Sequence, residues 1–359
     1  MSSGDTPAGG DRTAGLGSVA FARLARGNAR RWARLDPLLP VPRELLDGPA
    51  DAPVEPAVGD RPDTDPGRLL AARSGDSAAA GRWRHVRLDP TSLPANYDWL
   101  ESHRLRAAVD GTDQAAALTA LLDRWVPEVA ALADPVAQPD TGLTVTWPAR
   151  DVQAVAALTR RGFAPVAVVA ARLRAPRRAD GVGSGVPTAT IGPADPDDGL
   201  ELRPARLDDL DAVVALQLEE LFYDDLLGGL HLRSSVERAV RAAAAAALSR
   251  NDGSRILALR DGSAVGLVAV DLPDQADVGG LAAADRVGYV DCLSVTAGAR
   301  GSGVGRRLAR AADDRLAEDG AAVVLLTHST VNPLSAPFWA REGFRPLWVI
   351  WSRPLLLPA

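Results

Sequence analysis

The spacing of hydrophobic residues predicts alternating strands and helices over the C-terminal part of the chain. Leucine, valine and alanine recur every three or four residues from Asp208 onward, and again over Ser234–Ser249 and Gly303–Asp319, which is typical of amphipathic helices. Short apolar runs between turn residues predict the strands Leu200–Arg203, Arg255–Arg260, Ala264–Leu272, Tyr289–Val295, Val323–Thr327 and Leu347–Ser352. With a short helix at Ser335–Arg341, this order predicts a mixed α/β sheet layered with helices.

A segment in the middle of the chain repeats at its end. Shifting the sequence by 181 residues superimposes Thr144–Leu173 on Leu325–Pro354 without a gap. Gly162-Phe163 then coincides with Gly343-Phe344, and Arg172 with Arg353. Between the two copies, Pro, Gly, Ser, Thr and Asp dominate residues 176–199, which indicates an interdomain linker. The sequence therefore predicts two related halves behind a loose tail at residues 1–17.

Composition removes several classes of chemistry. The 359 residues include 40 lysines and arginines taken together, and every one of them is an arginine. A chain without lysine forms no Schiff base with pyridoxal phosphate or a substrate carbonyl, and it lacks the phosphate-binding lysine of P-loop and protein-kinase sites. One cysteine, Cys292, and four histidines exclude a disulfide framework and a multi-cysteine metal site, and we expect no bound metal.

Charge and hydropathy limit the kinds of binding partner that we expect. A net charge of −6 argues against a general nucleic-acid or anionic-membrane surface, because both depend on clustered positive charge. No stretch approaches the roughly 18 apolar residues of a membrane span, and residues 1–17 lack the apolar core of a signal peptide. We therefore expect a cytoplasmic monomer or homodimer without nucleic-acid or membrane partners.

The sequence from Leu293 to Arg306 runs from a predicted strand through a glycine-rich loop into a helix. Its glycines allow successive backbone N–H groups to point into one concavity, and the positive end of the following helix adds its dipole. Such a loop is a cradle for a pyrophosphate, with Arg300 and Arg306 as cationic contacts at the rim. It is no Rossmann fingerprint, because no βαβ unit continues from it into a parallel sheet.

These motifs resemble the signature of the GCN5-related N-acetyltransferase (GNAT) superfamily. The matching residues are the L-x-V strand end Leu293–Val295, the R-x-x-G-x-G loop Arg300–Gly305, and Asn332 followed by Phe338–Phe344. The resemblance covers Leu200–Ser352. With the internal repeat it implies two tandem GNAT-like domains, each a mixed, splayed central sheet flanked by helices. The first would be a degenerate domain at residues 18–175 and the second an acetyl-CoA-binding domain at residues 200–359.

The resemblance implies acetyl-CoA, or another acyl-CoA, as co-substrate, lying in a gap between strand 293–295 and strand 323–327. The backbone N–H of Val295 would polarise the thioester carbonyl. The residues that the resemblance places at this ligand are Leu293, Ser294, Val295, Arg300, Gly301, Ser302, Gly303, Val304, Gly305, Arg306, Asn332, Phe338 and Trp339.

The N-terminal copy departs from the pattern at the loop. Leu105–Val109 corresponds to the strand before it, but Asp110–Asp113 leads directly into a helix that begins near Gln114. Without a row of loop amides, this copy should bind CoA poorly or not at all. We expect it to supply packing surface, with a wall of the acceptor site as a further role.

Asp291, Tyr289 and His328 are candidates for the general base. By resemblance, Asp291 and Tyr289 stand where family members often carry that base, and strand alternation predicts that they share a face with Leu293 and Val295. Burial would raise the pKa of a carboxyl group at 291, which suits a base near neutral pH, and the alternative is a hydrogen-bonded structural aspartate. His328, expected just past its strand, is an independent base candidate or a capping or surface histidine.

The usual acid of the family is a tyrosine, and Trp339 stands at its position. An indole cannot protonate a departing thiolate. Three alternatives remain open: Tyr289 or Tyr223 substitutes, the thiolate leaves unassisted, or the enzyme is impaired. Cys292 is expected on the opposite strand face as buried filler.

An acidic and aromatic stretch late in the first predicted helix is the candidate acceptor site. It consists of Glu219, Glu220, Phe222, Asp224 and Asp225, beside Tyr223. Carboxylates next to aromatic rings attract cations, although acidic residues on a surface helix are commonly only solvated. The sequence thus predicts an N-acetyltransferase that acts on a primary amine of a small cationic molecule by direct attack. The alternative is a catalytically impaired acyl-CoA-binding or protein-interaction module, and aminoacyl transfer from tRNA is disfavoured by the acidity of the chain.

Overall fold

The structure, a computed structural model, describes residues 18–41, 67–132, 140–174, 199–228, 230–278 and 280–355. The N-terminal half contains α1 (Ser18–Leu35), β1 (Arg68–Ser74), β2 (Ser77–Arg87), β3 (Glu101–Asp110), α3 (Gln114–Leu132), β4 (Thr141–Pro148), α4 (Val155–Thr159) and β5 (Ala164–Leu173). The C-terminal half contains β6 (Leu200–Pro204), α5 (Leu210–Leu226), α6 (Val236–Ser249), β7 (Arg255–Arg260), β8 (Ser263–Asp271), β9 (Val287–Val295), α7 (Val304–Glu318), β10 (Val323–Ser329), α8 (Ser335–Arg341) and β11 (Arg345–Pro354). The predicted tail and the predicted linker, apart from Gly199, lie outside the described residues.

Every strand and helix that hydrophobic spacing predicts for the C-terminal half is present, in the predicted order. The first helix begins at Leu210 rather than Asp208, because a 3₁₀ turn precedes it in which the Asp209 carboxylate accepts a hydrogen bond from the Arg206 amide at 2.8 Å. β10 continues to Ser329, so His328 lies inside this strand and not beyond it.

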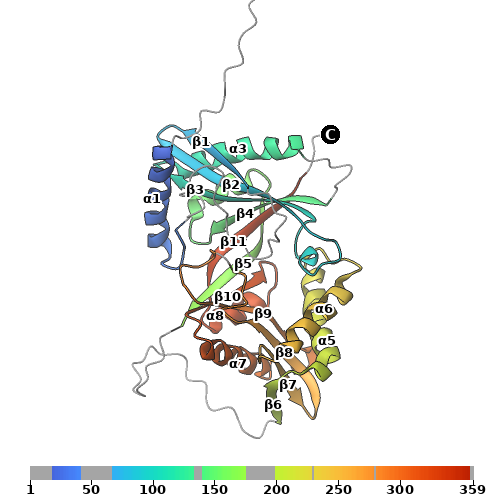
Figure 1. Cartoon of the computed structure of the whole chain (residues 1–359). Coiled ribbons are helices and arrows are strands. Elements are labelled where there is room, and N and C mark those ends of the chain that lie inside the picture. The colour runs from blue at the N-terminus through green and yellow to red at the C-terminus, as the bar shows by residue number, and fades with distance from the viewer. Residues whose placement is uncertain are drawn as a thin grey trace, which may run out of the picture.

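The eleven strands of the described residues form one sheet in the order β1-β2-β3-β4-β11-β5-β10-β9-β8-β7-β6. β11, drawn in red in Figure 1, runs up from the C-terminal half and inserts between β4 and β5. β5 in turn lies between β11 and β10. Each half therefore completes its sheet with the last strand of the other half. The mixed α/β fold is confirmed, and the strand exchange is a feature that the sequence did not predict.

Side chains repeat this exchange on both sides of the β5–β11 pair. The Arg172 guanidinium on β5 lies 4.7 Å from the centre of the Phe344 ring, and the Arg353 guanidinium on β11 lies 5.8 Å from the centre of the Phe163 ring. Each arginine also donates a hydrogen bond to a backbone carbonyl at the end of the short helix that precedes the ring it contacts. The 181-residue shift superimposes these pairs, so the duplicated segments make the same contact in reciprocal directions.

Helices cover both faces of the sheet. In the N-terminal half, α3 packs on one face over a core that includes Trp125 and Trp147, and α1 covers the other face. In the C-terminal half, α7 and α8 pack on one face, and α5 and α6 on the other. Trp351 of β11 is buried in the α3 core, so the exchanged strand joins the hydrophobic cores of the two halves. None of the helices described in the structure has the length and apolar character to cross a bilayer.

Replacing Trp351 by alanine tests this coupling. Removing a buried tryptophan side chain should lower the free energy of unfolding by about 3 kcal/mol. Because the two halves share β5 and β11, the whole chain should still unfold in one transition, which circular dichroism and tryptophan fluorescence can follow in denaturant. Leu173→Ala on β5, where the side chain is 65% exposed, is the control and should change stability by less than about 0.5 kcal/mol. Two separate transitions, only one of them shifted, would contradict a shared core.

Candidate active site

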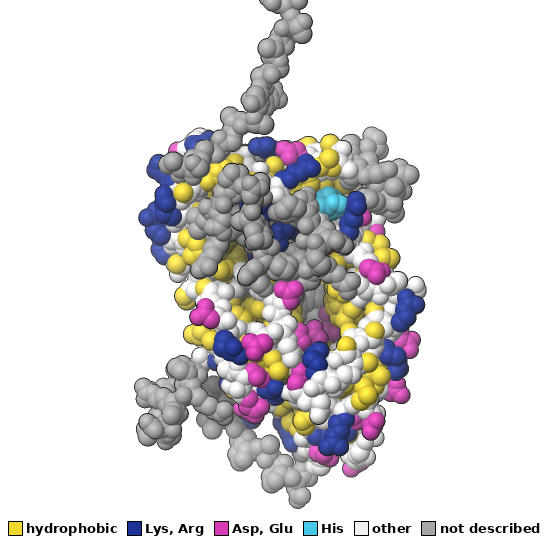
Figure 2. Space-filling model, in the orientation of Figure 1, with side chains coloured by type: hydrophobic (Ala, Val, Ile, Leu, Met, Phe, Trp, Pro, Cys, Tyr) yellow, Lys and Arg dark blue, Asp and Glu magenta, His cyan; other side chains and the backbone are white. Residues whose placement is uncertain are grey.

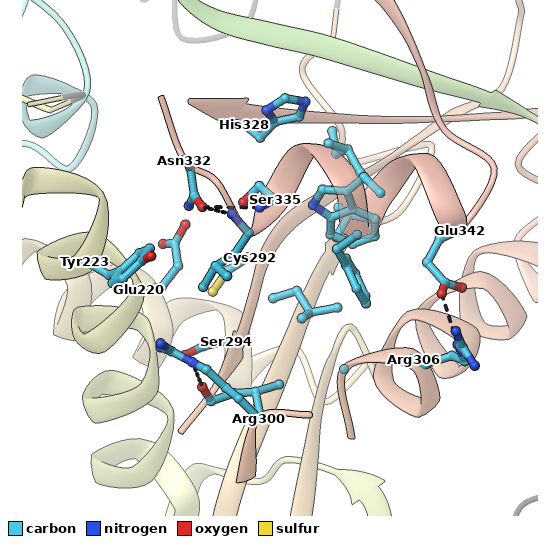
Figure 3. A pocket seen from close by; sticks show the side chains of 18 of the residues that line it. Glu220, Tyr223, Cys292, Ser294, Arg300, Arg306, His328, Asn332, Ser335 and Glu342 are labelled. Atoms are coloured by element: carbon cyan, nitrogen blue, oxygen red, sulfur yellow. Dashed lines mark hydrogen bonds and ion pairs between the residues drawn. The ribbon is translucent and has the colours of Figure 1, made fainter. Parts of the chain in front are cut away.

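β9 and β10 run side by side only briefly and then diverge. Their parallel pairing joins Val287–Val290 to Val323–Leu326, and no pairing between them continues beyond these residues of the described strands. A cavity of about 520 Å³ occupies the gap that opens there (Figure 3). Its lining comes from α5, β9, the loop before α7, β10 and α8, all in the C-terminal half. The splayed sheet that the sequence motifs imply for this half is therefore present.

The loop between β9 and α7 leaves the first turn of the helix uncapped. Gly301 and Gly303 have φ values of +79° and +87°, which glycine adopts at little cost and other residues rarely adopt. Gly303 is the N-cap of α7, and no side chain caps this end of the helix. The first N–H groups of a helix have no carbonyl partner within it and lie at its positive end. Because Gly301, Gly303 and Gly305 line the cavity, an anionic group of a ligand fits at this end.

The corresponding turn in the N-terminal half is capped by the protein itself. The Asp113 carboxylate accepts a hydrogen bond from the Ala116 amide at 2.9 Å, and the Ser77 hydroxyl accepts one from the Asp113 amide at 2.8 Å. These bonds use donors that a phosphate would need. The geometry supports the expectation that this half lacks a pyrophosphate cradle.

Arg300 joins the glycine loop to α5. Its Nε donates to the Val295 carbonyl at 3.0 Å, and its guanidinium lies 3.5 Å from the Glu219 carboxylate and 5.2 Å from the centre of the Tyr223 ring. Arg300 also lines the cavity, as expected for a residue at its rim. The side chain therefore links the phosphate end of the cavity with the helix that carries the candidate acceptor residues.

The α8 wall of the cavity is aromatic and tightly packed. Phe338 stands edge-on to Trp339, with 4.8 Å between ring centres, and Trp339 stands edge-on to Phe344 at 5.2 Å. A Cβ atom at Gly305 would lie 3.5 Å from the Phe338 ring, so α7 and α8 approach closely at this glycine. Arg306 adds a polar contact between the same helices, with its Nε 3.4 Å from the Glu342 carboxylate.

Asn332 connects α8 to α5. Its side-chain oxygen accepts hydrogen bonds from the Leu334 amide at 2.9 Å and the Ser335 amide at 3.2 Å, and its side-chain nitrogen donates to the Asp224 carboxylate at 2.6 Å. Figure 3 shows Asn332 and Ser335 together at the cavity. Its contact with a pantetheine arm stays a prediction, since the described bonds of this side chain go to the protein.

A β-bulge at Asp291 changes the alternation expected along β9. Residues 290 and 292 pair with consecutive residues of β8, which leaves Asp291 without a partner in the ladder. Leu293 packs in the cluster under α7, whereas Tyr289 packs in a separate cluster with β11 residues. The prediction that Tyr289, Asp291, Leu293 and Val295 share one face is wrong, because the bulge inserts one residue and turns the strand.

The candidates for proton transfer differ in whether they line the cavity. Asp291, His328 and Tyr223 line the cavity, and the ring nitrogen Nδ1 of His328 lies 3.0 Å from the Ser329 carbonyl. Tyr289 is absent from the lining, and burial raises the pKa of its hydroxyl. Cys292, predicted to be filler, is buried yet borders the cavity, where burial and the charge of Glu220 raise the pKa of its thiol.

The predicted acceptor residues divide by helix face. Glu220, Tyr223 and Asp224 line the cavity, as residues spaced i, i+3 and i+4 on one side of α5. The others point elsewhere, with Glu219 toward Arg300 and with Phe222 and Asp225 exposed to solvent. The helical spacing could have made this distinction from the sequence. Cavity residues that were not predicted include Thr327, Leu334 and Ser335, which lie in no motif, and Arg341 and Glu342, which lie within the Phe338–Phe344 motif but were given no role.

Three carboxyl groups meet at the α5 end of the cavity. Burial, with the negative charges of Asp224 and Asp291, raises the pKa of Glu220 to about 8. Burial and the charge of Asp271 raise the pKa of Asp291 to about 6, against the opposing effect of Arg255, which lies 3.9 Å away. Burial also raises the pKa of Asp224. Ionised Asp224 and Asp291 thus disfavour ionisation of Glu220, and a bound cation beside them would oppose this effect.

Glu220→Gln should show the cost of this crowding. The folded protein keeps Glu220 protonated up to a pKa of about 8, whereas the unfolded chain releases that proton near its ordinary pKa. The free energy of unfolding should therefore fall as pH rises from about 5 to 8, and glutamine removes this loss. The melting temperature of the variant relative to wild type should rise between pH 5 and pH 8.5. Asp225→Asn, exposed on the same helix, controls for the loss of one charge. A pH-independent difference for Glu220→Gln would contradict the raised pKa.

Comparison with known proteins places this geometry in a family. The model of the acetyltransferase (GNAT) family matches residues 216–344, which include the uncapped loop and α8. No curated protein sequence matches the chain.

Solved structures with similar folds include several that match this chain over most of the length of both chains. A GCN5-related N-acetyltransferase from Sphaerobacter thermophilus is 15% identical, with 79% of this chain and 82% of that chain covered and a TM-score of 0.47. A tandem GNAT protein from the clavulanic acid biosynthesis pathway is 19% identical, with 92% and 96% covered and a TM-score of 0.46. A GCN5-related N-acetyltransferase from Kribbella flavida is 15% identical, with 92% and 94% covered and a TM-score of 0.42. Because these TM-scores are below 0.5, the assignment depends on the family model and on the motif it contains. Residues 216–344 of this chain form a domain of the acetyltransferase (GNAT) family.

Proposed function

We propose that the C-terminal half transfers an acetyl group, or another acyl group, from acyl-CoA to a primary amine of a small cationic molecule. The observation that carries this proposal is the polarity of the cavity between β9 and β10. One end has the uncapped amides of α7, which suit a pyrophosphate, and the other has the carboxyl groups of Glu220, Asp224 and Asp291. The two co-substrates can thus approach each other from opposite ends of one gap.

The chain's own groups suit the two ends of such a ligand. The loop Gly301–Gly305 would hold the pyrophosphate, and Gly305, which has no Cβ, leaves room beside Phe338. Leu293 and Val295 border the gap where the pantetheine arm would lie, with backbone groups available to its amides. Bound there, acyl-CoA supplies an activated acyl group, and the protein's task is to position the amine and move a proton.

Asp291 is the best-supported general base. It lines the cavity, and its pKa of about 6 leaves it ionised at neutral pH. When the amine nitrogen bonds to the carbonyl carbon and the carbon–sulfur bond breaks, the amine loses a proton, which Asp291 would take directly or through water. Glu220 is protonated at neutral pH because its pKa is about 8, so Asp224 serves mainly to attract the cation.

The departing thiolate has fewer candidates for its proton. Trp339 is 8% exposed between Phe338 and Phe344 and carries no acidic group. Tyr223 borders the cavity and contacts Arg300, so it is the candidate acid. Trp339 is also the observation that favours the second candidate function, an acyl-CoA-binding module with no turnover.

Gly305→Leu tests the assignment of the phosphate end. The added side chain would enter the space beside Phe338, while the helical backbone at this position is unstrained. We expect acetyl-CoA binding to weaken by at least about tenfold, or 1.4 kcal/mol, in isothermal titration calorimetry, and circular dichroism checks that the variant is folded. Gly298→Leu, in the same connection but with open space around it, should bind normally. If both variants bound acetyl-CoA equally well, the assignment of the cavity as the acyl-CoA site would be wrong.

Asp291→Asn tests the base. At neutral pH, kcat/KM for amine acetylation should fall by about a hundredfold, because the group that accepts the proton is lost. For the wild type, log kcat/KM should rise with pH and bend near the Asp291 pKa of about 6, and the variant should lack this bend. Asp271→Asn is the matched variant, because it removes a carboxylate outside the cavity lining and keeps the base: it should retain turnover and move the bend to lower pH, since the charge of Asp271 helps to raise the pKa of Asp291. Acyl-CoA binding without turnover by the wild type for any amine in a broad panel would favour the binding module instead.

A further inference from the structure

Asp224 occupies an electrostatically unfavourable place in the last turn of α5. The carbonyl groups at the end of a helix carry partial negative charge, so basic side chains are favoured there and carboxylates are not. The last turn of α5 nevertheless contains Asp224 and Asp225 and no basic residue. Asp225 is exposed to solvent, whereas Asp224 is only 9% exposed and lines the cavity. A buried carboxylate at this end of a helix needs a partner that stabilises its charge.

Asn332 supplies that partner from the turn before α8. Its side-chain nitrogen donates to the Asp224 carboxylate at 2.6 Å, and both residues are buried at the cavity. In Figure 3, Asn332 faces the helix that carries Glu220 and Tyr223. A hydrogen bond from a neutral donor favours the ionised form of a carboxyl group, so this bond opposes the effect of burial on the pKa of Asp224.

The other end of the Asn332 side chain fixes its orientation. Its oxygen accepts hydrogen bonds from the Leu334 amide at 2.9 Å and the Ser335 amide at 3.2 Å. Oxygen and nitrogen belong to one planar group, so the bonds that hold the oxygen also direct the nitrogen, which donates to Asp224. Asn332 therefore joins the start of α8 to the end of α5 in one set geometry.

Titratable groups on three elements face Asp224. They are Glu220 on α5, Cys292 on β9 and His328 on β10. Glu220 and Cys292 keep their protons at neutral pH because the pKa of each is raised, and a positive charge on His328 favours an ionised Asp224. Figure 2 shows a hollow between the upper and lower parts of the molecule, where acidic side chains have hydrophobic ones on either side, a pattern that suits an organic cation.

We propose that Asn332 is a positioning residue for the acceptor: its hydrogen bond holds the Asp224 carboxylate as the group that binds the cationic amine. A carboxylate has two oxygens with several lone pairs, so one bond from Asn332 leaves acceptors for an ammonium group. This inference rests on the proposed function, because the cation is the amine of that reaction. It differs from the role that the sequence resemblance implies for Asn332, a contact with the pantetheine arm, and the two roles predict different losses.

Asn332→Ser separates the two ends of the side chain. A serine oxygen can still accept from the amides at the start of α8, but its side chain is too short to reach Asp224. Without the donor, the pKa of Asp224 should rise. Benzylamine and 1,3-diaminopropane should therefore bind about tenfold more weakly than to wild type at pH 6.5, and within about threefold at pH 8.5, where the carboxyl group ionises without help. Isothermal titration in the presence of CoA measures both amines, and acetyl-CoA affinity, titrated separately, should stay within about twofold.

Two further variants make the comparison specific. Thr330→Ala, in the same connection, removes a hydrogen bond from its hydroxyl to the Pro165 carbonyl and should bind the amines and acetyl-CoA within about twofold of wild type. Asp224→Asn should lose amine affinity at both pH values. Adding Asn332→Ser to Asp224→Asn should cause no further loss, because Asn332 acts through Asp224. Circular dichroism checks that each variant is folded, and Asn332→Thr, with the same hydroxyl, replaces the serine variant if that one is not.

Several results would overturn the proposal. These are unchanged amine binding by Asn332→Ser at pH 6.5, an equal loss at both pH values, and additive losses in the double variant. A loss confined to acetyl-CoA would instead place Asn332 at the pantetheine arm, and no binding of either amine by the wild type would remove the acceptor site itself. Failure of the proposed function has a different signature, since the wild type would then bind the amines in a way that depends on Asn332 but transfer no acetyl group to any amine.

Discussion

The pairing of β5 with β11 at the centre of the sheet is the contact on which the rest of the structure depends. Because the last strand of each half completes the sheet of the other, the cores meet along this pair, and Trp351 of β11 lies among residues of the N-terminal half. The exchange also shapes the cavity. β10 pairs with β5 over the whole of Val323–Ser329 but with β9 only as far as Leu326. β10 therefore keeps its hydrogen bonds to β5 along its whole length while it diverges from β9. The gap can stay open because only the edge of β10 that faces β9 loses its strand partner.

The β-bulge at Asp291 gives that gap its chemistry. In a regular strand, the side chains at 289 and 291 would follow Leu293 toward α7. The extra residue leaves Asp291 free of the ladder and bordering the cavity, where it meets Glu220 and Asp224 from α5. Burial raises the pKa of all three carboxyl groups, and the charges of Asp224 and Asp291 add to the shift at Glu220, which is a common arrangement where a site must exchange protons or receive a cation.

The two halves differ in the capping of the same turn. Gly303 leaves the start of α7 uncapped, whereas Asp113 and Ser77 use the amides at the start of α3. Only the start of α7 therefore leaves backbone N–H donors free of side-chain caps for a phosphate. The N-terminal half keeps the strands and reciprocal contacts that close the sheet, and its residues Pro90–Trp99 form hydrogen bonds with the connection between α5 and α6 of the other half.

The sequence by itself determined what local spacing controls. Hydrophobic periodicity predicted every element of the C-terminal half, and the glycine loop before α7 predicted an anion site, because both depend on residues close together in the chain. It also showed the 181-residue repeat. The last strands of its two copies, β5 and β11, have the same bounds after the shift. The tertiary structure alone decided which half each strand completes. Pairing across the repeat and within it satisfies the same hydrogen bonds, so spacing cannot distinguish them. The bulge at Asp291 and the docking of Asn96 on the α5–α6 connection likewise depend on contacts between distant segments, and no pattern within either segment records them.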